Sequence, residues 1–163
     1  MNTFKTISRI AVEDFLIAET ALLDELKLTE WLSLFLPEAQ YLIPSLDRPE
    51  SSPRESLYLV ADDIRRLKSR VQQFQGRAMW VENPPSRTRH MLSNVRIVEA
   101  TPDHIHVSAN FVVYRIRGDV VDPYVGHYEH LLVPEDGSFR FKLRKAVLDL
   151  EALRPFGKIS IIL

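Results

Sequence analysis

Residues 80–98 read WVENPPSRTRHMLSNVRIV, and this stretch decides the fold. Pro84 and Pro85 cannot donate the hydrogen bonds of a sheet, so extended pairing is expected only after them. From Arg87 the sequence alternates with a period of two, which predicts a β-strand whose apolar residues gather in its second half. The first half is basic and follows a rigid proline corner. A strand has this composition when its beginning faces another protein rather than water.

Before this stretch the periodicity is helical. Steps of three and four predict a helix over residues 7–26 with an apolar stripe formed by Ile7, Ala11, Phe15, Ala18, Leu22 and Leu26. Thr29 is the expected N-cap of a second, short helix. Asp62 is the expected N-cap of a third helix, with Gly76 at its C-cap. Two short strands are expected between the second and third helices, over residues 39–43 and 57–60.

After this stretch strand spacing continues to the end of the chain. A central strand over residues 87–99 is followed by further expected strands over 105–113, 124–133, 139–147 and 159–163. The short turns between them favour antiparallel neighbours. Helices followed by a meander of strands predict an α+β fold with the helices on one face of a curved sheet. We expect one domain over residues 1–163.

Composition excludes several classes of function. With 45% apolar and 26% charged residues, this is an ordinary globular chain. A net charge of −1 gives no electrostatic reason to expect nucleic acid or an anionic membrane as a partner. No run of residues suggests a signal peptide or a membrane span. The absence of cysteine excludes disulfides, thiol nucleophiles and clusters held by thiolates.

Histidines provide one candidate metal site. His104 and His106 are two residues apart, so they share one face of a strand, and Glu129 or His130 could complete a site with two histidines and one carboxylate. The alternative, which we favour, is that His104 is a solvated residue beside a turn. His127 and His130 fall on opposite faces of their strand and are not expected to bind one ion together.

Asp14 and His90 are the candidates for acid–base catalysis inside the fold. The alternative is that Asp14 pairs with an arginine or caps a helix, and that His90 is a satisfied or interfacial histidine. Arg87 and Arg89 could bind a carboxylate, but arginine is also enriched at protein interfaces. Arg144 is expected on a solvated face. The apolar ending KISIIL is expected to pair within the sheet or to lie in a subunit contact.

Four segments resemble the small (β) subunits of bacterial aromatic-ring-hydroxylating dioxygenases. They are PPSRTRHMLSNVRI (84–97), VEDFLIAETALLDELKLTEWLSLF (12–35), NFVVYR (110–115) and RKAVLDLEALRPFGKISIIL (144–163). The resemblance covers essentially the whole chain. It implies an NTF2-like fold, also called SnoaL-like or cystatin-like, in which a strongly curved, mostly antiparallel sheet forms a cone around the N-terminal helices.

The resemblance also implies a function. In this family the large (α) subunit carries the Rieske [2Fe–2S] cluster and the mononuclear Fe(II), and three β chains join three α chains in an α3β3 hexamer. The β subunit is non-catalytic, so no cofactor or metal is expected in this chain. A Rieske centre needs two cysteines, and this chain has none. The complex would use NADH and O2 in the cytoplasm to make cis-dihydrodiols, and the sequence looks closest to the branch that acts on substituted benzenes such as p-cumate.

On this interpretation six residues lie in or near subunit contacts: Trp80, Pro84, Pro85, Arg87, Arg89 and His90. Their role would be shape and polar pairing rather than catalysis. One alternative is a stand-alone NTF2-like isomerase, dehydratase or cyclase that uses Asp14 or His90 in the cone. Another is a ligand-binding or purely structural homotrimer.

Overall fold

The computed structural model describes residues 7–76, 85–153 and 159–163. The helices and strands of these residues are α1 (Arg9–Asp24), α2 (Leu28–Leu32), β1 (Phe35–Ile43), β2 (Val60–Asp63), α3 (Ile64–Gln75), β3 (Arg87–Ala100), β4 (Ile105–Arg117), β5 (Val120–Glu135) and β6 (Ser138–Leu148). The six strands form one sheet in the order β2-β1-β6-β5-β4-β3. The predicted α+β class is confirmed.

The sheet is mostly antiparallel. Strands β3, β4, β5 and β6 form an antiparallel meander, because short turns join each strand to the next. Strand β1 extends the sheet by pairing parallel with β6 and antiparallel with β2. Among the described strands β3 pairs only with β4, so the strand expected at the centre lies at an edge of the sheet.

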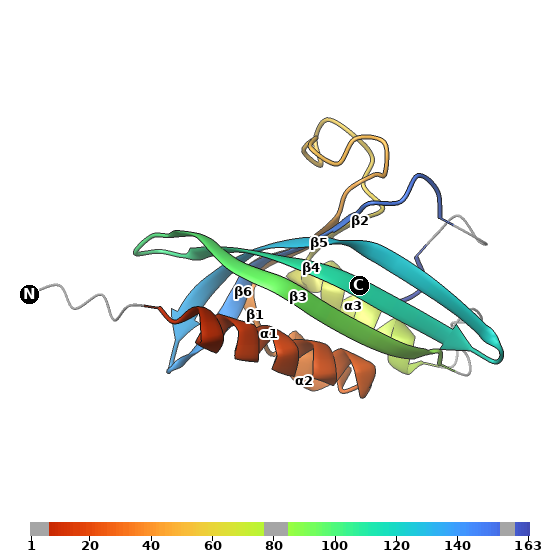
Figure 1. The fold of residues 1–163 in the computed structure, drawn as a ribbon, viewed down its shortest axis with the longest axis horizontal. Helices are drawn as coiled ribbons and strands as arrows, with labels where there is room; N and C mark the ends of the chain where they lie inside the picture. Colours follow the sequence, from red (N-terminus) through yellow and green to blue (C-terminus); the bar gives the residue numbers. More distant parts are fainter. Residues whose placement is uncertain (1–6, 77–84, 154–158) are drawn as a thin grey trace, which may run out of the picture.

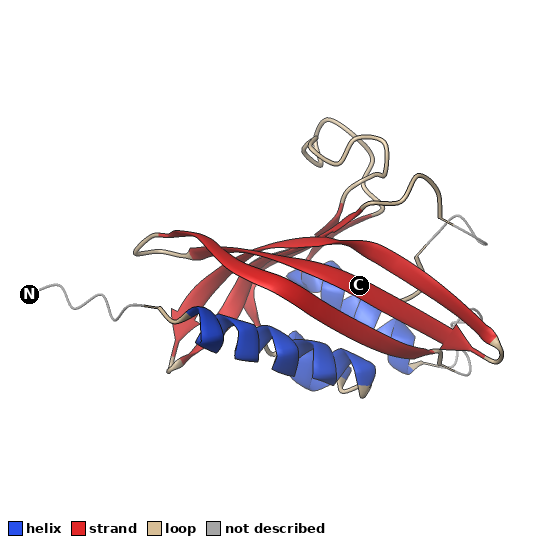
Figure 2. Cartoon of the chain, viewed as in Figure 1, coloured by secondary structure: helices blue, strands red, loops and turns tan. Residues whose placement is uncertain are grey.

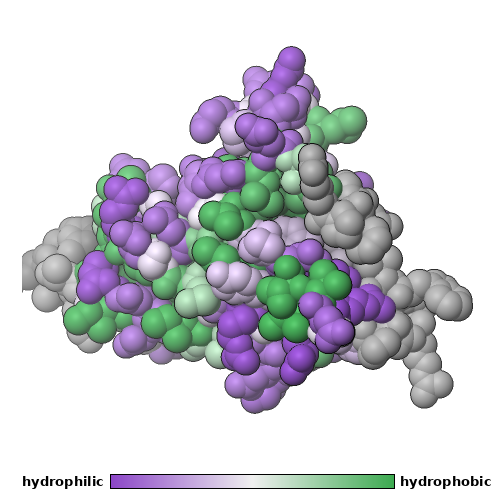
Figure 3. All heavy atoms as spheres, turned by 45° about the vertical axis from the view of Figure 1, so that its right-hand side comes forward, coloured by the Kyte–Doolittle hydropathy of each residue, from purple (hydrophilic) through white to green (hydrophobic). Residues whose placement is uncertain are grey.

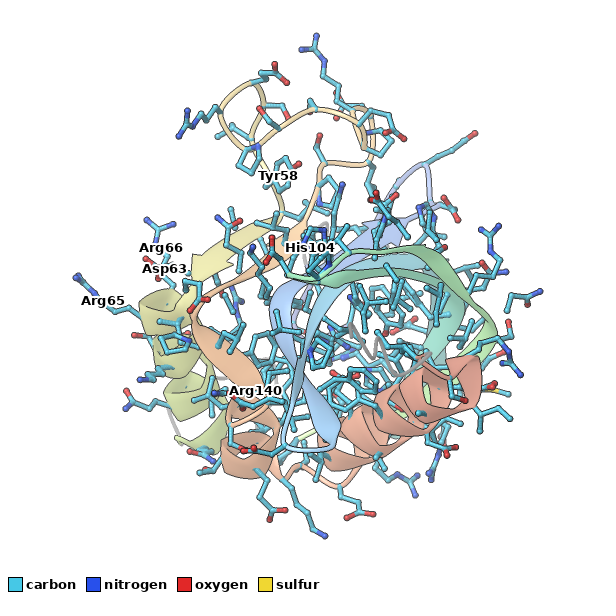
Figure 4. The ribbon with its side chains drawn as sticks, turned by 90° about the vertical axis from the view of Figure 1, so that its left-hand side faces the viewer. Tyr58, Asp63, Arg65, Arg66, His104 and Arg140 are labelled. Atoms are coloured by element: carbon cyan, nitrogen blue, oxygen red, sulfur yellow. The ribbon has the colours of Figure 1, made fainter. Side chains whose placement is uncertain are left out.

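The helices lie on the concave side of the curved sheet (Figures 1 and 2). Helix α1 packs against β3 and β6, and α3 packs against β1 and β2. Figure 4 shows side chains filling the space that the curled sheet and the helices enclose. We call this space the cone. Its buried polar and aromatic side chains include Glu19, Trp31, Tyr41, His90, Phe111, Tyr128, His130, Phe141 and Arg144.

Helix α1 turns a different side to the sheet than the sequence predicted. Its buried residues are Val12, Phe15, Leu16, Glu19, Thr20 and Leu23. The predicted stripe is wrong by about one residue, a rotation of about 100°, because Val12, Leu16 and Leu23 bury more apolar surface than the exposed Ala11 and Ala18. The rotation carries Glu19 into the cone and places Asp14 on the exposed side.

The first half of the chain otherwise follows the prediction with shifted boundaries. Helix α2 has Lys27 at its N-cap, so the prediction of Thr29 is wrong. Gly76 is the C-cap of α3, as predicted, and its φ of −86° is one that any residue adopts. Strand β1 begins earlier than expected, and β2 begins where the expected strand over 57–60 ends.

The N-cap of α3 is Asp63 rather than the predicted Asp62. The Asp63 carboxylate accepts a hydrogen bond from the Arg66 backbone N–H at 2.8 Å, which satisfies one of the free donors of the first turn. Asp62 lies in β2 and forms an ion pair with Arg70 at 2.6 Å. Neighbouring aspartates therefore have separate roles, one in the helix cap and one in fixing α3 to the sheet.

A bulge in β6 explains why Arg144 is buried rather than solvated. Leu131 pairs with Leu143, but the next residue of β5, Leu132, pairs with Phe141, so β6 holds one extra residue there. After a bulge the alternation of faces changes phase. Phe141 and Arg144 therefore both face the cone, although their odd separation predicts opposite faces.

The final segment, residues 159–163, is not the predicted strand. Ser160, Ile161, Ile162 and Leu163 are each at most 7% exposed, and the last three belong to the hydrophobic core cluster rather than to the sheet. The apolar ending is thus covered by its own chain. None of the helices in the described part of the chain combines the length and the apolar character that a membrane crossing requires.

Candidate functional site

Strand β3 contributes to two different surfaces, because successive side chains of a strand point to opposite faces. Arg87, Arg89 and Met91 are exposed on the outer face of the sheet, whereas Thr88 and His90 point toward α1. The alternation that the sequence predicted is therefore present. It separates the two arginines from the histidine that follows them.

The six residues predicted to lie in subunit contacts do not share one surface in the structure. Trp80 and Pro84 lie outside the described residues. Pro85 is exposed immediately before β3, and Arg87 and Arg89 are exposed and make no ion pair or hydrogen bond with any other described residue. The sixth residue, His90, is only 9% exposed and belongs to the cone.

An open hollow lies beside these arginines on the outer face of the sheet. Its volume is about 790 Å³, and its lining comes from β3, β4 and β5 with Asp149 beyond β6. Within it His127 lies 3.3 Å from Glu129 and 3.7 Å from Asp149, and Lys145 pairs with Glu129 at 3.1 Å. Apolar, polar and charged side chains all contribute to this surface. The hollow suits contact with a protein surface better than enclosure of a small molecule.

On the inner face His90 forms a tight pair with Asp24 at the end of α1. The His90 Nδ1 lies 2.5 Å from Asp24 Oδ1, and the Thr88 hydroxyl and the His90 backbone N–H donate to the same carboxylate at 3.0 Å and 3.0–3.2 Å. On its other side, His90 Nε2 lies 3.1 Å from the Ile162 carbonyl oxygen. Both ring nitrogens of His90 lie within hydrogen-bonding distance of an oxygen atom, so the ring is held from both sides.

These contacts set the protonation of Asp24. Burial alone would raise the pKa of Asp24, but hydrogen bonds from the His90 side chain and backbone, the His90 charge and the Thr88 hydroxyl together lower it below its ordinary value. A carboxyl group whose pKa is lower in the folded than in the unfolded state stabilises the fold at pH values above its unfolded-state pKa. That stabilisation is lost as the pH falls through its folded-state pKa.

We therefore expect the free energy of unfolding to fall less steeply in Asp24→Asn than in the natural chain as the pH is lowered through and below the ordinary pKa of an aspartate. Asp24→Asn lowers stability at neutral pH, and its diagnostic signature is the reduced slope. Urea unfolding at a series of pH values measures it. Asp14→Asn, the same change at an exposed position of α1, serves as the control. Equal slopes for Asp24→Asn and the natural chain would contradict the assignment.

A second buried pair lies deeper in the cone. Glu19 Oε1 accepts hydrogen bonds from Arg144 Nε at 2.7 Å and from Trp31 Nε1 at 2.6 Å. Arg144 also donates through Nη1 to the Leu163 carbonyl oxygen. Its guanidinium carbon lies 5.0 Å from the Tyr128 ring centroid, and further aromatic rings surround it. Burial alone would lower the pKa of Arg144, but the Glu19 charge raises it, so the pair is ionic.

His130 lies in the same interior and is completely buried. Burial, followed by the nearby charge of Arg144, lowers the pKa of His130 well below its ordinary value. Its Nδ1 accepts a hydrogen bond from the Lys145 backbone N–H at 3.3 Å, so the neutral ring carries its proton on Nε2. His130 is thus a neutral packing residue.

The cavity beside His90 has little room for a substrate. The cavity beside His90 has a volume of about 30 Å³, which is close to the space of one water molecule. Ligand pockets for small molecules are typically about 300–1,000 Å³. Asp14 is exposed and does not face this cavity, so its expected place on the buried side of the helix is wrong. His90 reaches a carbonyl of its own chain.

The candidate metal ligands do not come together. The described residues contain no group of three or more histidine, aspartate or glutamate side chains with the geometry of a metal site. Glu129 is instead held by Lys145 and His127 on the outer face, while His130 points into the cone. His127 and His130 do lie on opposite faces of β5, as predicted.

Sequence reasoning missed the two carboxylates that organise the cone, Asp24 and Glu19. Neither was among the candidate residues identified from the sequence. Glu19 follows Val12, Phe15 and Leu16 at helical steps, so a stripe drawn through these residues would have included it. No such signal identifies Asp24, because its partners on β3 are more than sixty positions away along the chain.

Comparisons with known proteins agree on the family. The family model described as "Ring hydroxylating beta subunit" matches residues 18–155. The small oxygenase component of the p-cumate 2,3-dioxygenase system of Pseudomonas putida is 43% identical over 158 residues, which cover 96% of this chain and 88% of that protein.

Two solved structures show the same fold. The β subunit of benzoate 1,2-dioxygenase from Burkholderia mallei aligns with a TM-score of 0.79 at 24% identity, covering 96% of this chain and all of that one. A candidate scytalone dehydratase from Novosphingobium aromaticivorans aligns with a TM-score of 0.64 at 17% identity, covering 92% and 91%. The predicted NTF2-like fold is confirmed, and the chain belongs to the family of ring-hydroxylating dioxygenase β subunits.

Proposed function

We propose that this chain is the structural subunit of an aromatic-ring-hydroxylating dioxygenase, in which it positions a large subunit that performs the chemistry. The observation that carries the proposal is the 43% identity to the p-cumate small oxygenase component across nearly the whole chain. The small cavity beside His90 supports it, because a space of about 30 Å³ at this candidate catalytic residue does not hold an aromatic ring. The partner is the large (α) subunit, and three copies of each chain form an α3β3 hexamer.

In this assembly the cofactors belong to the large subunit. It carries a Rieske [2Fe–2S] cluster and a mononuclear Fe(II), and these 163 residues offer no cysteine for the thiolate ligands of such a cluster. Electrons come from NADH, which places the complex in the cytoplasm. The substrate is a substituted benzene of the p-cumate type, converted with O2 to a cis-dihydrodiol.

The outer face of the sheet is the proposed subunit contact. Arg87 and Arg89 are exposed there and pair with no other residue in the described part of the chain. The exposed side chains of Met91 and Val125, which line the outer hollow, lie on the same face. Figure 3 shows that exposed hydrophobic side chains on the face it displays occur in separate areas among hydrophilic ones. Such mixed surfaces are typical of protein interfaces, in which arginine is enriched and charge pairing determines the orientation of the partners.

We expect the double variant Arg87→Ala/Arg89→Ala to weaken assembly with the large subunit by tenfold or more, because each truncation leaves a partner carboxylate unpaired in the contact. Co-expression of both subunits, followed by size-exclusion chromatography with light scattering, measures the hexamer fraction. The matched control is Arg65→Ala/Lys68→Ala, since both side chains are exposed on α3, which packs on β1 and β2 at the opposite end of the strand order from β3. An unchanged hexamer fraction in the Arg87/Arg89 variant would remove both residues from the contact.

The same preparation tests the function as a whole. The chain purified with its large subunit should give a coloured, iron-containing complex that oxidises an aromatic ring. The rival function is a stand-alone enzyme that uses Asp14 or His90. It requires that the chain alone converts a small substrate and that it does not bind the large subunit.

A further inference from the structure

The segment over residues 159–163 occupies the cone in the manner of a bound peptide. It belongs to no helix or strand of the described structure, yet its last four residues are almost completely buried. The side chains of Ile161 and Ile162 form part of the wall of the small cavity beside His90, together with Leu23, Leu28 and Phe74. The segment therefore fills interior space without adding to the sheet.

The polar contacts of this segment are made by its backbone. The Ile162 carbonyl oxygen lies 3.1 Å from His90 Nε2, and the Leu163 carbonyl oxygen accepts a hydrogen bond from Arg144 Nη1. The Leu163 backbone N–H donates to the Tyr41 hydroxyl at 3.2 Å. The three receptor side chains come from β3, β6 and β1, so the contacts surround the peptide instead of extending one strand.

Two of the receptor side chains are held in place independently of the segment. Asp24 fixes His90 through the 2.5 Å contact with Nδ1, and Glu19 fixes Arg144 through the 2.7 Å contact with Nε. Donors that are already oriented lose little conformational entropy when a ligand arrives, which favours binding. The cone thus has the features of a preorganised site with directed donors for carbonyl oxygens and an apolar lining.

From these contacts we infer that the cone is a binding site for an extended apolar peptide that presents carbonyl oxygens to His90 and Arg144, and that residues 159–163 are its ligand in cis. The inference does not depend on the proposed function. It gives the two buried acid–base pairs a role in binding.

Cutting the chain in its folded state tests the inference. A recognition site for a sequence-specific protease is inserted within residues 154–158 of the full chain, which is folded first and cut afterwards. We expect the cut segment to co-elute with the body in size-exclusion chromatography. A fluorescent synthetic peptide of residues 158–163 should replace it, with exchange measured by fluorescence anisotropy.

Two matched changes test whether the backbone contacts matter. A peptide N-methylated at the Leu163 nitrogen loses the donor that contacts Tyr41, and Tyr41→Phe removes the acceptor from the other side. Each change is expected to weaken binding of the peptide by about fivefold to tenfold, as for one lost hydrogen bond. A peptide of the same composition in scrambled order should bind at least tenfold more weakly than the natural sequence.

The possible outcomes separate clearly. Release of the segment with loss of the near-ultraviolet circular dichroism signal, restored on adding the peptide, supports the inference, as does direct exchange. Release followed by no rebinding in excess peptide overturns it, whether or not the body stays folded. Equal binding of the natural, N-methylated and scrambled peptides also overturns it, because the cone would then act only as an apolar surface.

Discussion

Replacing Arg144 with methionine is expected to lower the free energy of unfolding by about 3–5 kcal/mol, because it leaves the Glu19 carboxylate buried without its charge partner. The Arg144 side chain is 0% exposed and the Glu19 side chain 1%, so water cannot replace the lost contact. Methionine has a similar length and no charge, so the loss reports mainly on the uncompensated carboxylate. Urea unfolding followed by tryptophan fluorescence measures it, since Trp31 donates to the same carboxylate.

Two controls separate the ion pair from simple packing. In the double variant Glu19→Leu/Arg144→Met neither charge is buried alone, so its loss should be smaller than the sum of the two single losses by at least about 2 kcal/mol. Arg9→Met removes an exposed ion pair with Glu13, whose side chains are 53% and 34% exposed, and should change stability by less than about 1 kcal/mol. Additive losses in the double variant would show that Arg144 contributes through volume alone.

The architecture could be predicted from the sequence because it depends on local periodicity. Steps of three and four before the proline corner and a period of two after it give the helices and the meander, and short turns give antiparallel neighbours. The same alternation correctly placed Arg87 and Arg89 on one face of their strand and His90 on the other. The order of the strands in the sheet could not be predicted in this way, because the parallel pairing of β1 with β6 joins segments that are distant in the sequence.

The interior of the cone was harder to predict, because its decisive features are not local. Arg144 faces inward owing to one extra residue in β6, and nothing in the sequence of that strand marks the bulge. The burial of Glu19 was missed because α1 carries apolar residues on more than one side, including the exposed Ile10 and Ile17. Two different apolar stripes therefore fit the helical period. A charged residue is expected to be exposed unless its partner is known. Here each charge is the reason that the other is buried.

Gly126→Ala is the second change with a large expected effect, a loss of about 2–3 kcal/mol in the free energy of unfolding, because it overpacks a rigid part of the sheet. A Cβ atom built on Gly126 would lie 2.0 Å from the Val147 carbonyl oxygen and 3.0 Å from the Phe111 ring. The first distance is far below any normal contact. The carbonyl belongs to the backbone of β6, so it cannot rotate away as a side chain could.

The strain should also reach the cone, because Gly126 lies in the same pair of strands as the buried charges. Leu148 opposes Gly126, and farther along the two strands Arg144 opposes His130. Moving β6 away to admit a methyl group would loosen this pairing, so amide hydrogen exchange in β5 and β6 should increase together with the loss of stability. Gly76→Ala is the control, since its φ is −86° and the nearest atom would be at 3.3 Å. If Gly126→Ala lost no more stability than the control, the backbone of β6 would have to move at Val147 without breaking its hydrogen bonds to β5. The close approach of the two strands would then not constrain the fold.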